Sequence, residues 1–395
     1  MFQKSVIVSM ARTAIGTFGG SLKSKTAIEL GAIAARSALE RSRVPAAMVD
    51  EVVFGCVGQY GLNAFLSRLV GLSSGVPETA SAQTVNRMCA SGLQAIVTAS
   101  QLIESGDADV TLAGGAESMS NYPYTLQDAR FGMRMGVQET ALLDALTTAL
   151  CEPTSGEKVH IAVTAENIAQ RYGLTREELD AYALKGQRLA RAAIENGLFK
   201  EEIVPVELKG KGEVTVFDTD EHPRDTSLDK LAKLKPFVKS DGVVTAGNAS
   251  GINDGAAALV IVSREKASEL GVMPIARVVD FACAGVDPKY MGLGPVDSTR
   301  KLLKKTGLSL SDIGLVELNE AFAAQAVGCI KELGLNPDIV NVNGSGIALG
   351  HPIGATGAII SIKLINEMRR RSIRYGLATL CIGGGQGMSV LFEAL

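Results

Sequence analysis

Three side chains in this sequence have the types and surroundings needed for covalent and proton-transfer chemistry: Cys89, His351 and Cys381. Cys89 lies where a strand-like segment ends and a helix-like stretch begins. The start of a helix favours negative charge, and the thiolate is the nucleophilic form of cysteine. Because cysteine is also a common small buried residue, this segment alone fits a nucleophile and a packing residue equally well.

His351 is one of three histidines, and the segment 343–357 around it holds five glycines. A single histidine in an apolar segment is more often structural than catalytic. Cys381 comes just before the run Gly383 to Gly385, whose backbone N–H groups could face a developing oxyanion. Asn319 follows another strand-like segment and offers an amide. These residues could form one site if the fold brings their segments together.

The elements that would position these residues occur twice along the chain. In each half a strand leads through a tight turn into an apolar helix, and then a buried strand ends at a glycine pair, as in segments 86–115 and 339–384. Cys89 and His351 occupy the corresponding turn in the two copies, so the two turns can converge. Apolar strands that alternate with helices predict an α/β protein with helices on both faces of its sheets, in five layers.

Composition excludes several functions. The net charge is −3, and the one basic block, 369–371, would cap the end of a predicted helix, which argues against a nucleic-acid partner. No apolar run has the length of a membrane helix. The six cysteines show no metal-ligand or disulfide spacing, so we expect no metal and a reduced, cytoplasmic setting. With 395 residues the chain has room for two or three domains.

At these segments the sequence resembles the thiolase family over essentially its whole length. The resemblance extends to five further segments, at 11–16, 115–120, 164–167, 246–250 and 291–296. It implies a duplicated thiolase-like fold with an inserted loop domain. We expect an N-terminal half from 1–118 with 253–274, an inserted domain for CoA binding and oligomer contacts at 119–252, and a C-terminal half at 275–395.

The resemblance also implies a role for each residue. Cys89 would take an acyl group from an acyl-CoA while His351 removes its thiol proton, and Cys381 would exchange a proton with the α-carbon of a second acyl-CoA. One oxyanion hole would comprise the His351 ring and a water held by Asn319. The other would use the N–H groups of Cys89 and Gly383. CoA would be a substrate, and no cofactor is expected.

The positions that match CoA contacts of the family line the expected path of the substrate. They are Leu150, His160, Arg224, Ala246, Ser250, Met291, Ala321 and Phe322. An exposed arginine is also a common solvated charge, so Arg224 fits that reading nearly as well. Glu320, next to Asn319, would order waters or neighbouring side chains.

The sequence departs from the common family pattern at several points. Ile161 and Ala162 replace Met-Gly after His160, and Phe237 and Ser345 also differ. We expect these changes to affect the acyl pocket, with short to medium chains preferred, more than the chemistry. The resemblance also implies a homotetramer, with contacts from apolar residues of the insert. Those residues are Tyr122, Tyr124, Leu126, Phe131 and Met133.

Two rival functions remain. A 3-oxoacyl carrier protein synthase would share the doubled fold but would normally have a second catalytic histidine where this chain has Cys381. A thiolase-like carrier of lipids or acyl-CoA would have the fold without needing all of the motifs together. Neither condensation nor thiolysis is favoured by the sequence, because both directions use the same residues.

Overall fold

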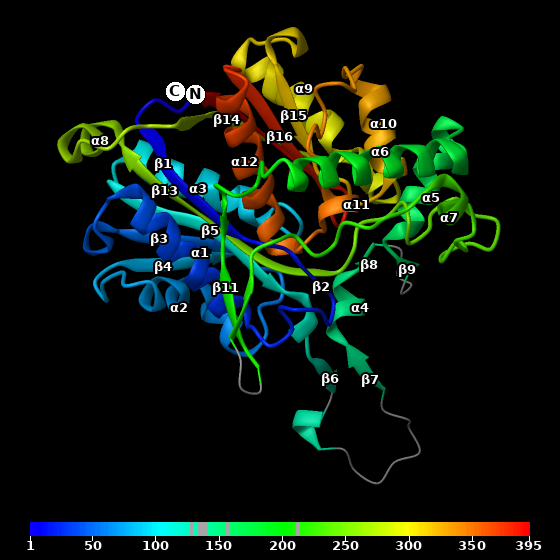
Figure 1. The fold of residues 1–395 in the computed structure, drawn as a ribbon, viewed down its shortest axis with the longest axis horizontal. Coiled ribbons are helices and arrows are strands. Elements are labelled where there is room, and N and C mark those ends of the chain that lie inside the picture. Colours follow the sequence, from blue (N-terminus) through cyan, green and yellow to red (C-terminus); the bar gives the residue numbers. More distant parts are fainter. Residues whose placement is uncertain (127–128, 133–140, 155–158, 211–213) are drawn as a thin grey trace.

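The computed structural model describes residues 1–126, 129–132, 141–154, 159–210 and 214–395, and it has two halves of like topology (Figure 1). The strands and helices of the N-terminal half are β1 (Ser5–Thr13), α1 (Ala27–Ser42), β3 (Glu51–Gly55), α2 (Leu66–Ser73), β4 (Ser81–Val85), α3 (Ser91–Ser105), β5 (Val110–Ser118) and β13 (Asn253–Ser263). Those of the C-terminal half are β14 (Ala276–Gly285), α9 (Gly294–Thr306), β15 (Leu315–Leu318), α10 (Ala323–Leu333), α11 (Gly346–Leu349), α12 (Ile353–Arg370), β16 (Tyr375–Ile382) and β17 (Gln386–Ala394).

The strand pairing repeats between the halves. In the first half, β3 runs parallel to β5, and β13 pairs antiparallel with both β5 and β1. In the second half, β15 runs parallel to β16, and β17 pairs antiparallel with both β16 and β14. The two sets meet through the pair Ile7 and Ala276 on β1 and β14. The predicted duplication is therefore confirmed.

Helices α3 and α12 pack against each other between the two sets of strands. The helices can approach closely because glycines face each other: a Cβ on Gly357 would lie 2.2 Å from the backbone nitrogen of Leu93. Helices α1 and α2 cover the outer face of the first sheet, and α9 and α10 cover that of the second. The five predicted layers are therefore present. They are the outer helices α1 and α2, the strands of the first half, helices α3 and α12, the strands of the second half, and the outer helices α9 and α10.

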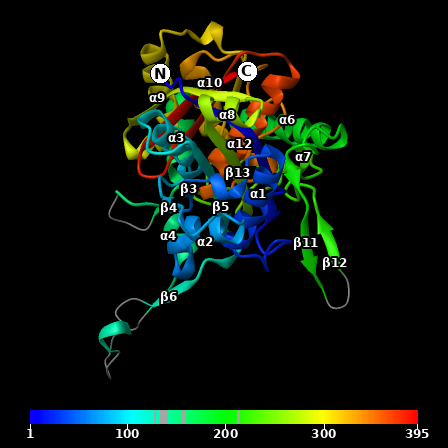
Figure 2. The same cartoon turned by 90° about the vertical axis from the view of Figure 1, so that its left-hand side faces the viewer.

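The segment between β5 and β13 adds further elements along one side of the molecule. They are β6 (Tyr124–Leu126), β7 (Leu142–Asp144), α4 (Ala145–Ala149), β8 (Cys151–Glu152), β9 (Val159–His160), α5 (Ala162–Tyr172), α6 (Arg176–Glu195), β10 (Ile203–Val204), β11 (Val206–Lys209), β12 (Val214–Phe217) and α7 (Leu228–Ala232). Strands β6 and β7 belong to an arm that projects from the body (Figures 1 and 2). Helices α5 and α6 pack on α10 of the C-terminal half. In the described part of the chain, no helix combines the length and apolar character required to cross a membrane.

Candidate active site

Cys89 lies in a tight turn between β4 and α3. The side chain of Asn86 accepts a hydrogen bond from the Met88 backbone N–H at 3.0 Å. The Ser91 hydroxyl accepts from the Arg87 N–H at 2.9 Å and donates to the Met88 carbonyl at 2.7 Å. Met88 has a φ of +47°, a left-handed conformation that such side-chain contacts stabilise. The two polar side chains fix the turn that presents the thiol.

The surroundings of Cys89 keep its thiol protonated. Burial raises the pKa of Cys89 to about 11, although the backbone N–H groups of Gly383 and of Cys89 itself donate to the sulfur and lower it. A helix start favours the thiolate, but here the loss of water outweighs the two N–H donors. The thiol therefore needs a base close by when it reacts.

The His351 ring is buried and held at both nitrogens. Its Nδ1 lies 2.6 Å from the hydroxyl oxygen of Thr356, and that hydroxyl donates to the Pro352 carbonyl at 2.9 Å. Because the hydroxyl donates its proton to Pro352, Nδ1 of His351 carries the ring proton and Nε2 has the lone pair, which faces the Asn319 amide nitrogen. Burial lowers the pKa of His351 to about 4, which leaves the ring neutral near pH 7. A neutral ring with a basic Nε2 can accept a proton.

Asn319 and Cys381 complete the centre from two strands of the C-terminal half. The Asn319 amide nitrogen lies 3.3 Å from His351 Nε2, and its backbone N–H donates to Thr379 on β16. Its buried Oδ1 has no hydrogen-bond partner in the described residues, which suits an ordered water. Cys381 is fully buried; burial raises the pKa of its thiol, and Cys89 lies near enough to raise it further.

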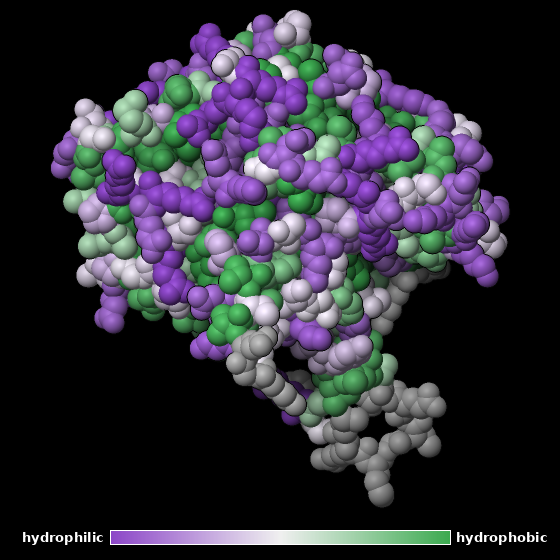
Figure 3. Space-filling view, viewed as in Figure 1, coloured by the Kyte–Doolittle hydropathy of each residue, from purple (hydrophilic) through white to green (hydrophobic). Residues whose placement is uncertain are grey.

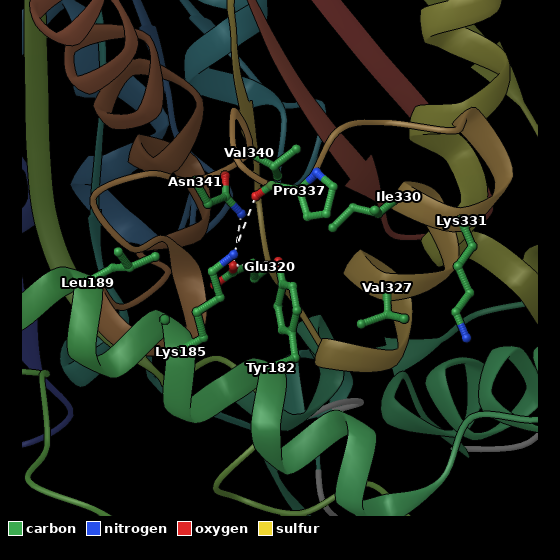
Figure 4. Close-up of a pocket in the computed structure, with 11 residues that line it drawn as sticks. Tyr182, Lys185, Leu189, Glu320, Val327, Ile330, Lys331, Pro337, Val340 and Asn341 are labelled. Atoms are coloured by element: carbon green, nitrogen blue, oxygen red, sulfur yellow. Dashed lines mark hydrogen bonds between the residues drawn. The ribbon is translucent and has the colours of Figure 1, made fainter.

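Glu320 is not one of the reactive groups, and its carboxylate forms hydrogen bonds with residues of neighbouring segments. Its buried carboxylate accepts from the Tyr182 hydroxyl and the Asn341 amide, both at 2.8 Å, and from the Ile347 N–H at 3.3 Å. The same carboxylate borders a cavity of about 390 Å³ between α6 and α10, on the side toward Lys185 (Figure 4). Glu320 therefore orders neighbouring groups, as expected from the sequence.

The positions predicted to contact CoA lie in separate parts of the structure. Arg224 and Ala246 line one cavity of about 170 Å³, together with His222 and Ile347. The exposed Arg224 guanidinium has no ion-pair partner in the described residues. A small, open-walled cavity with a free cation at its edge has the character of a site for an anionic ligand.

A second group lies in and beside the apolar cluster that contains Cys381. The Ser250 N–H donates to the Ala321 carbonyl at 2.9 Å, and Ala249 pairs with Phe322. Ala321, Phe322 and Met291 belong to the same apolar cluster as Cys381. The structure thus brings these predicted positions together beside the second cysteine.

His160 and Leu150 lie on the insert near Cys89. Leu150 packs in the same small apolar cluster as Cys89, and its carbonyl accepts from the Ile161 N–H at 2.8 Å. The His160 ring meets the Phe237 ring edge to face, with centroids 5.5 Å apart. Ile161 Cδ1 would lie 3.7 Å from a Cβ on Gly383. Of the departures from the family pattern, Ile161 therefore borders the site, and Phe237 packs on His160.

Sequence reasoning overlooked three residues that hold His351. Thr356 fixes the ring, and Asn253 Oδ1 accepts from the His351 backbone N–H at 2.9 Å. His222 lies 3.3 Å from the amide of Asn253. Thr356 could have been found, because it follows His351 in the first turn of the next helix. Asn253 and His222 are distant in sequence, and only the fold places them here.

Comparison with known proteins gives the same family along the whole chain. Residues 5–265 match the family described as "Thiolase, N-terminal domain", and residues 272–394 match "Thiolase, C-terminal domain". The beta-ketothiolase BktB of Cupriavidus necator is 52% identical over 399 residues. The acetyl-CoA acetyltransferase of Syntrophomonas wolfei is 49% identical over 398 residues. Each alignment covers 100% of both chains.

A solved structure agrees with these relatives. The crystal structure of human mitochondrial 3-ketoacyl-CoA thiolase in complex with CoA is 42% identical, with a TM-score of 0.95. The match covers 100% of this chain and 98% of the human chain. Fold, sequence and motifs agree from one end to the other, and the chain belongs to the thiolase family.

Proposed function

We propose that the protein is an acyltransferase that catalyses reversible Claisen condensation of an acyl-CoA with acetyl-CoA, or thiolysis of a 3-oxoacyl-CoA. The observation that carries this proposal is the meeting of a thiol, a neutral imidazole and a second buried thiol: Cys89 packs in one cluster with Ile353, two residues after His351, and lies near enough to Cys381 to raise the pKa of that thiol. Relatives at about half identity are named acetyl-CoA acetyltransferase and beta-ketothiolase, which favours this activity over a carrier or an acyl carrier protein synthase.

In the first half-reaction, the sulfur of Cys89 attacks the thioester carbonyl of an acyl-CoA. The thiol proton passes to Nε2 of His351, and then to the sulfur of the departing CoA. The oxyanion of the tetrahedral intermediate accepts from the N–H groups of Cys89 and Gly383, which already point at the sulfur. The product is an acyl thioester on Cys89 and free CoA.

In the second half-reaction, the thiol proton of Cys381 passes to Nε2 of His351, and the Cys381 thiolate then takes a proton from the α-carbon of acetyl-CoA. The enolate oxygen accepts from the protonated Nε2 of His351 and from a water held by Asn319, whose buried oxygen is free for it. The enolate carbon attacks the acyl carbonyl on Cys89, the bond from carbonyl carbon to sulfur breaks, and the Cys89 thiolate takes the proton from Nε2 of His351. The reverse sequence is thiolysis. This ping-pong order needs one acyl-enzyme and two oxyanion sites.

CoA enters as substrate, and we propose no cofactor. Its nucleotide end is assigned to the cavity of Arg224 and Ala246, and its pantetheine arm to the wall of Ser250, Ala321 and Phe322. A structural neighbour holds CoA, which supports a CoA site in this fold. His160, Leu150 and Met291 would border the acyl and thioester end. No group of three or more potential metal ligands occurs among the described residues.

The acyl chain is proposed to be short to medium in length. Ile161 is buried beside Gly383 and Met88, where its branched side chain fills space next to the acyl carbonyl. A series of 3-oxoacyl-CoA substrates of increasing length, assayed with free CoA, would give kcat/KM for each. A maximum at long chains would contradict the proposed chain length without affecting the reaction type.

A homotetramer in the cytoplasm is also proposed. Two exposed apolar surfaces support oligomer contacts. The arm exposes Tyr124, Leu126 and Leu142, and Figure 3 shows apolar atoms gathered where it leaves the body. A second surface, missed in the sequence, exposes Leu62 and Phe65 beside the edge strand β4. Large exposed apolar side chains and an open sheet edge are typical of protein contacts.

Tyr122 differs from the other residues expected at the arm contact. Tyr122 is half-buried and donates its hydroxyl to the Glu117 carboxylate at 3.0 Å, so it is not part of the exposed arm surface. Met133 lies outside the described residues, and so does the side chain of Phe131. The tetramer proposal rests on the remaining arm residues and on the β4 edge.

The test of the catalytic proposal is the site of acylation. After brief incubation with acetyl-CoA, mass spectrometry of peptides should place the acetyl group on the peptide that contains Cys89. Cys89→Ser should abolish it, whereas Cys283→Ser, at a half-buried cysteine on β14, should leave it intact. Acetylation of Cys381 instead would overturn the assignment of the nucleophile, and the absence of any acyl-enzyme would favour a carrier.

A further inference from the structure

His222 is a buried histidine outside the residues assigned to the reaction, and both of its ring nitrogens are engaged. Its Nδ1 lies 3.3 Å from the side-chain nitrogen of Asn253, and its other nitrogen bonds to the backbone carbonyl of Ile347. An amide nitrogen can only donate and a carbonyl can only accept, so Nδ1 is the acceptor and Nε2 carries the proton. The ring is therefore fixed as one neutral tautomer.

Asn253 joins this ring to the catalytic turn. The orientation of its fully buried amide is set by the backbone N–H of His351, which donates to Oδ1 at 2.9 Å. Its two amide hydrogens then go to the Gly16 carbonyl, at 2.9 Å, and to His222. Every polar atom of the amide has a partner, so rotation of Asn253 would break several bonds at once.

The turn before His351 packs directly on this amide. Gly350 has a φ of +104°, and a Cβ there would lie 2.6 Å from the side chain of Asn253. His222 thus holds the turn at two points: at Ile347 directly, and at the His351 N–H through Asn253. These points lie at the two ends of the segment 347–351, so together they restrict both its position and its orientation.

The chain segment of His222 also reaches the proposed nucleotide cavity. His222, Arg224 and Ile347 line that cavity together. Gln187 links them again, because it accepts from the Arg224 N–H at 2.8 Å and donates to the Ile347 carbonyl at 3.4 Å. The cavity wall and the catalytic turn are therefore parts of one hydrogen-bonded unit.

We propose that His222 is a positioning residue that holds the His351 turn and the wall of the nucleotide cavity in a single arrangement, and so aligns His351 with Cys89. This inference rests on the proposed function. His222 does not touch the reacting atoms and exchanges no proton in the reaction. A shift of about 1 Å in a reacting group can cost on the order of a hundredfold in rate, so the loss of this support is measurable.

The test compares His222→Phe, which keeps a ring of similar size without hydrogen bonds, with His222→Gln, which can still accept and donate. In single-turnover experiments with acetyl-CoA, His222→Phe should acylate Cys89 about tenfold to a hundredfold more slowly. His222→Gln should recover most of that rate. Thr111→Val is the matched control, because it removes one buried hydrogen bond on β5, to Ile261, far from the site.

The pH dependence separates positioning from stability. With His351 in place, acylation of the wild-type protein should be level through the neutral range. With His351 displaced, only Cys89 that has already ionised without a base can attack acetyl-CoA. The acylation rate of His222→Phe should therefore rise as the pH increases toward the pKa of Cys89. A role in stability alone would lower the melting temperature of His222→Phe, as in Thr111→Val, and leave rate and pH profile unchanged; that result would overturn the inference.

A fallback variant covers the case in which His222→Phe does not fold. His222→Asn can keep the contact with Asn253 but is too short to reach Ile347, and its acylation rate should fall about threefold or more. An unchanged rate in this folded variant would also overturn the inference. If wild-type Cys89 is not acylated at all, it is the proposed function that fails, so the two failures can be told apart.

Discussion

At the scale of single residues, the two cysteines of the site have distinct surroundings. Cys89 is half-buried at a turn and receives two backbone N–H groups at its sulfur. Cys381 is fully buried at the end of β16 among apolar side chains. The N–H donors at Cys89 can stabilise an oxyanion, whereas the apolar side chains around Cys381 can accommodate the α-carbon of a substrate. The surroundings of the two thiols therefore suit them to different roles.

Cys381→Ser tests this division of labour. Serine keeps the size of the side chain but hardly ionises near neutral pH, so it is a poor base. Acylation of Cys89 depends on His351 and the N–H donors and should be largely retained. Condensation should fall by about 10² to 10⁴-fold, the usual contribution of a positioned acid or base. A burst assay measures both steps, and an equal fall in both would show that Cys381 is not a dedicated α-carbon base.

The pH dependence of acylation tests the role of His351. Burial lowers the pKa of His351 to about 4, so the ring is neutral and able to accept a proton at any pH well above that value. The acylation rate should therefore be level from pH 8 down to about 5 and fall only as the pH approaches 4, when Nε2 becomes protonated. Single-turnover rates across this range provide the measurement. An inflection near 6.5, where free histidine titrates, would contradict the structure.

Much of this centre could be predicted from residue types, and the rest could not for a physical reason. Cys89, His351 and Cys381 stand in short segments with glycines and turn-forming neighbours, so local sequence marks them. The raised pKa of Cys89 depends on burial, which arises only when the halves pack together. The support from Asn253 and His222 depends on contacts between segments about a hundred residues from His351.

At the scale of elements, the repeat was visible because both copies have an apolar strand, a turn and an apolar helix in the same order. The family resemblance already grouped residues 253–274 with the N-terminal half. The position of β13 between β1 and β5 was not predicted, because these strands are far apart in sequence. The same holds for Glu202 and Asp220, which contact β1 through a buried ion-pair cluster. There Arg12 binds Glu202 at 2.7 Å and Asp220 at 2.8 Å.

Arg12→Met tests how strongly this cluster joins the elements. The substitution leaves two carboxylates buried without their partner, which typically costs about 3 to 5 kcal/mol. Urea unfolding at a fixed protein concentration should show a loss of that order. Arg191→Met is the matched control, because its ion pair with Asp225 is exposed, with 45% and 79% of the two side chains accessible, and such pairs contribute about 0 to 1 kcal/mol. Equal effects of the two changes would contradict a structural role for the buried cluster.

Arg12 also links stability to the proposed function. Asp220 accepts from the Ile15 N–H at 2.8 Å as well as from Arg12, and it stands two residues before His222. A loosened segment would therefore disturb both the nucleotide cavity and the support of His351. The residues that lead to the ligand wall are anchored to the core strand β1 by this ion-pair cluster and by the parallel pairing of β10 with β1.

At the scale of the whole molecule, the arm and the β4 edge present apolar surface at separate places. Tyr124 and Leu142 on the arm are 64% and 63% accessible, and Leu62 and Phe65 beside β4 are 69% and 62% accessible. Two separate surfaces fit a dimer of dimers, in which each surface forms one type of contact. One subunit pair could then form through the sheet edges, and two pairs could join through the arms.

Leu142→Asp should separate the two contacts. A carboxylate in the centre of the arm surface would have to be buried without a partner on assembly, so the tetramer should dissociate to dimers while the β4 contact persists. Light scattering at micromolar concentration should give twice the mass of one chain for the variant and four times for the wild type. Val214→Asp is the matched control, because this residue is 60% accessible on a different hairpin, and it should leave the mass unchanged. A monomeric wild-type protein would exclude the proposed assembly, and a tetrameric Leu142→Asp variant would exclude the arm as its contact.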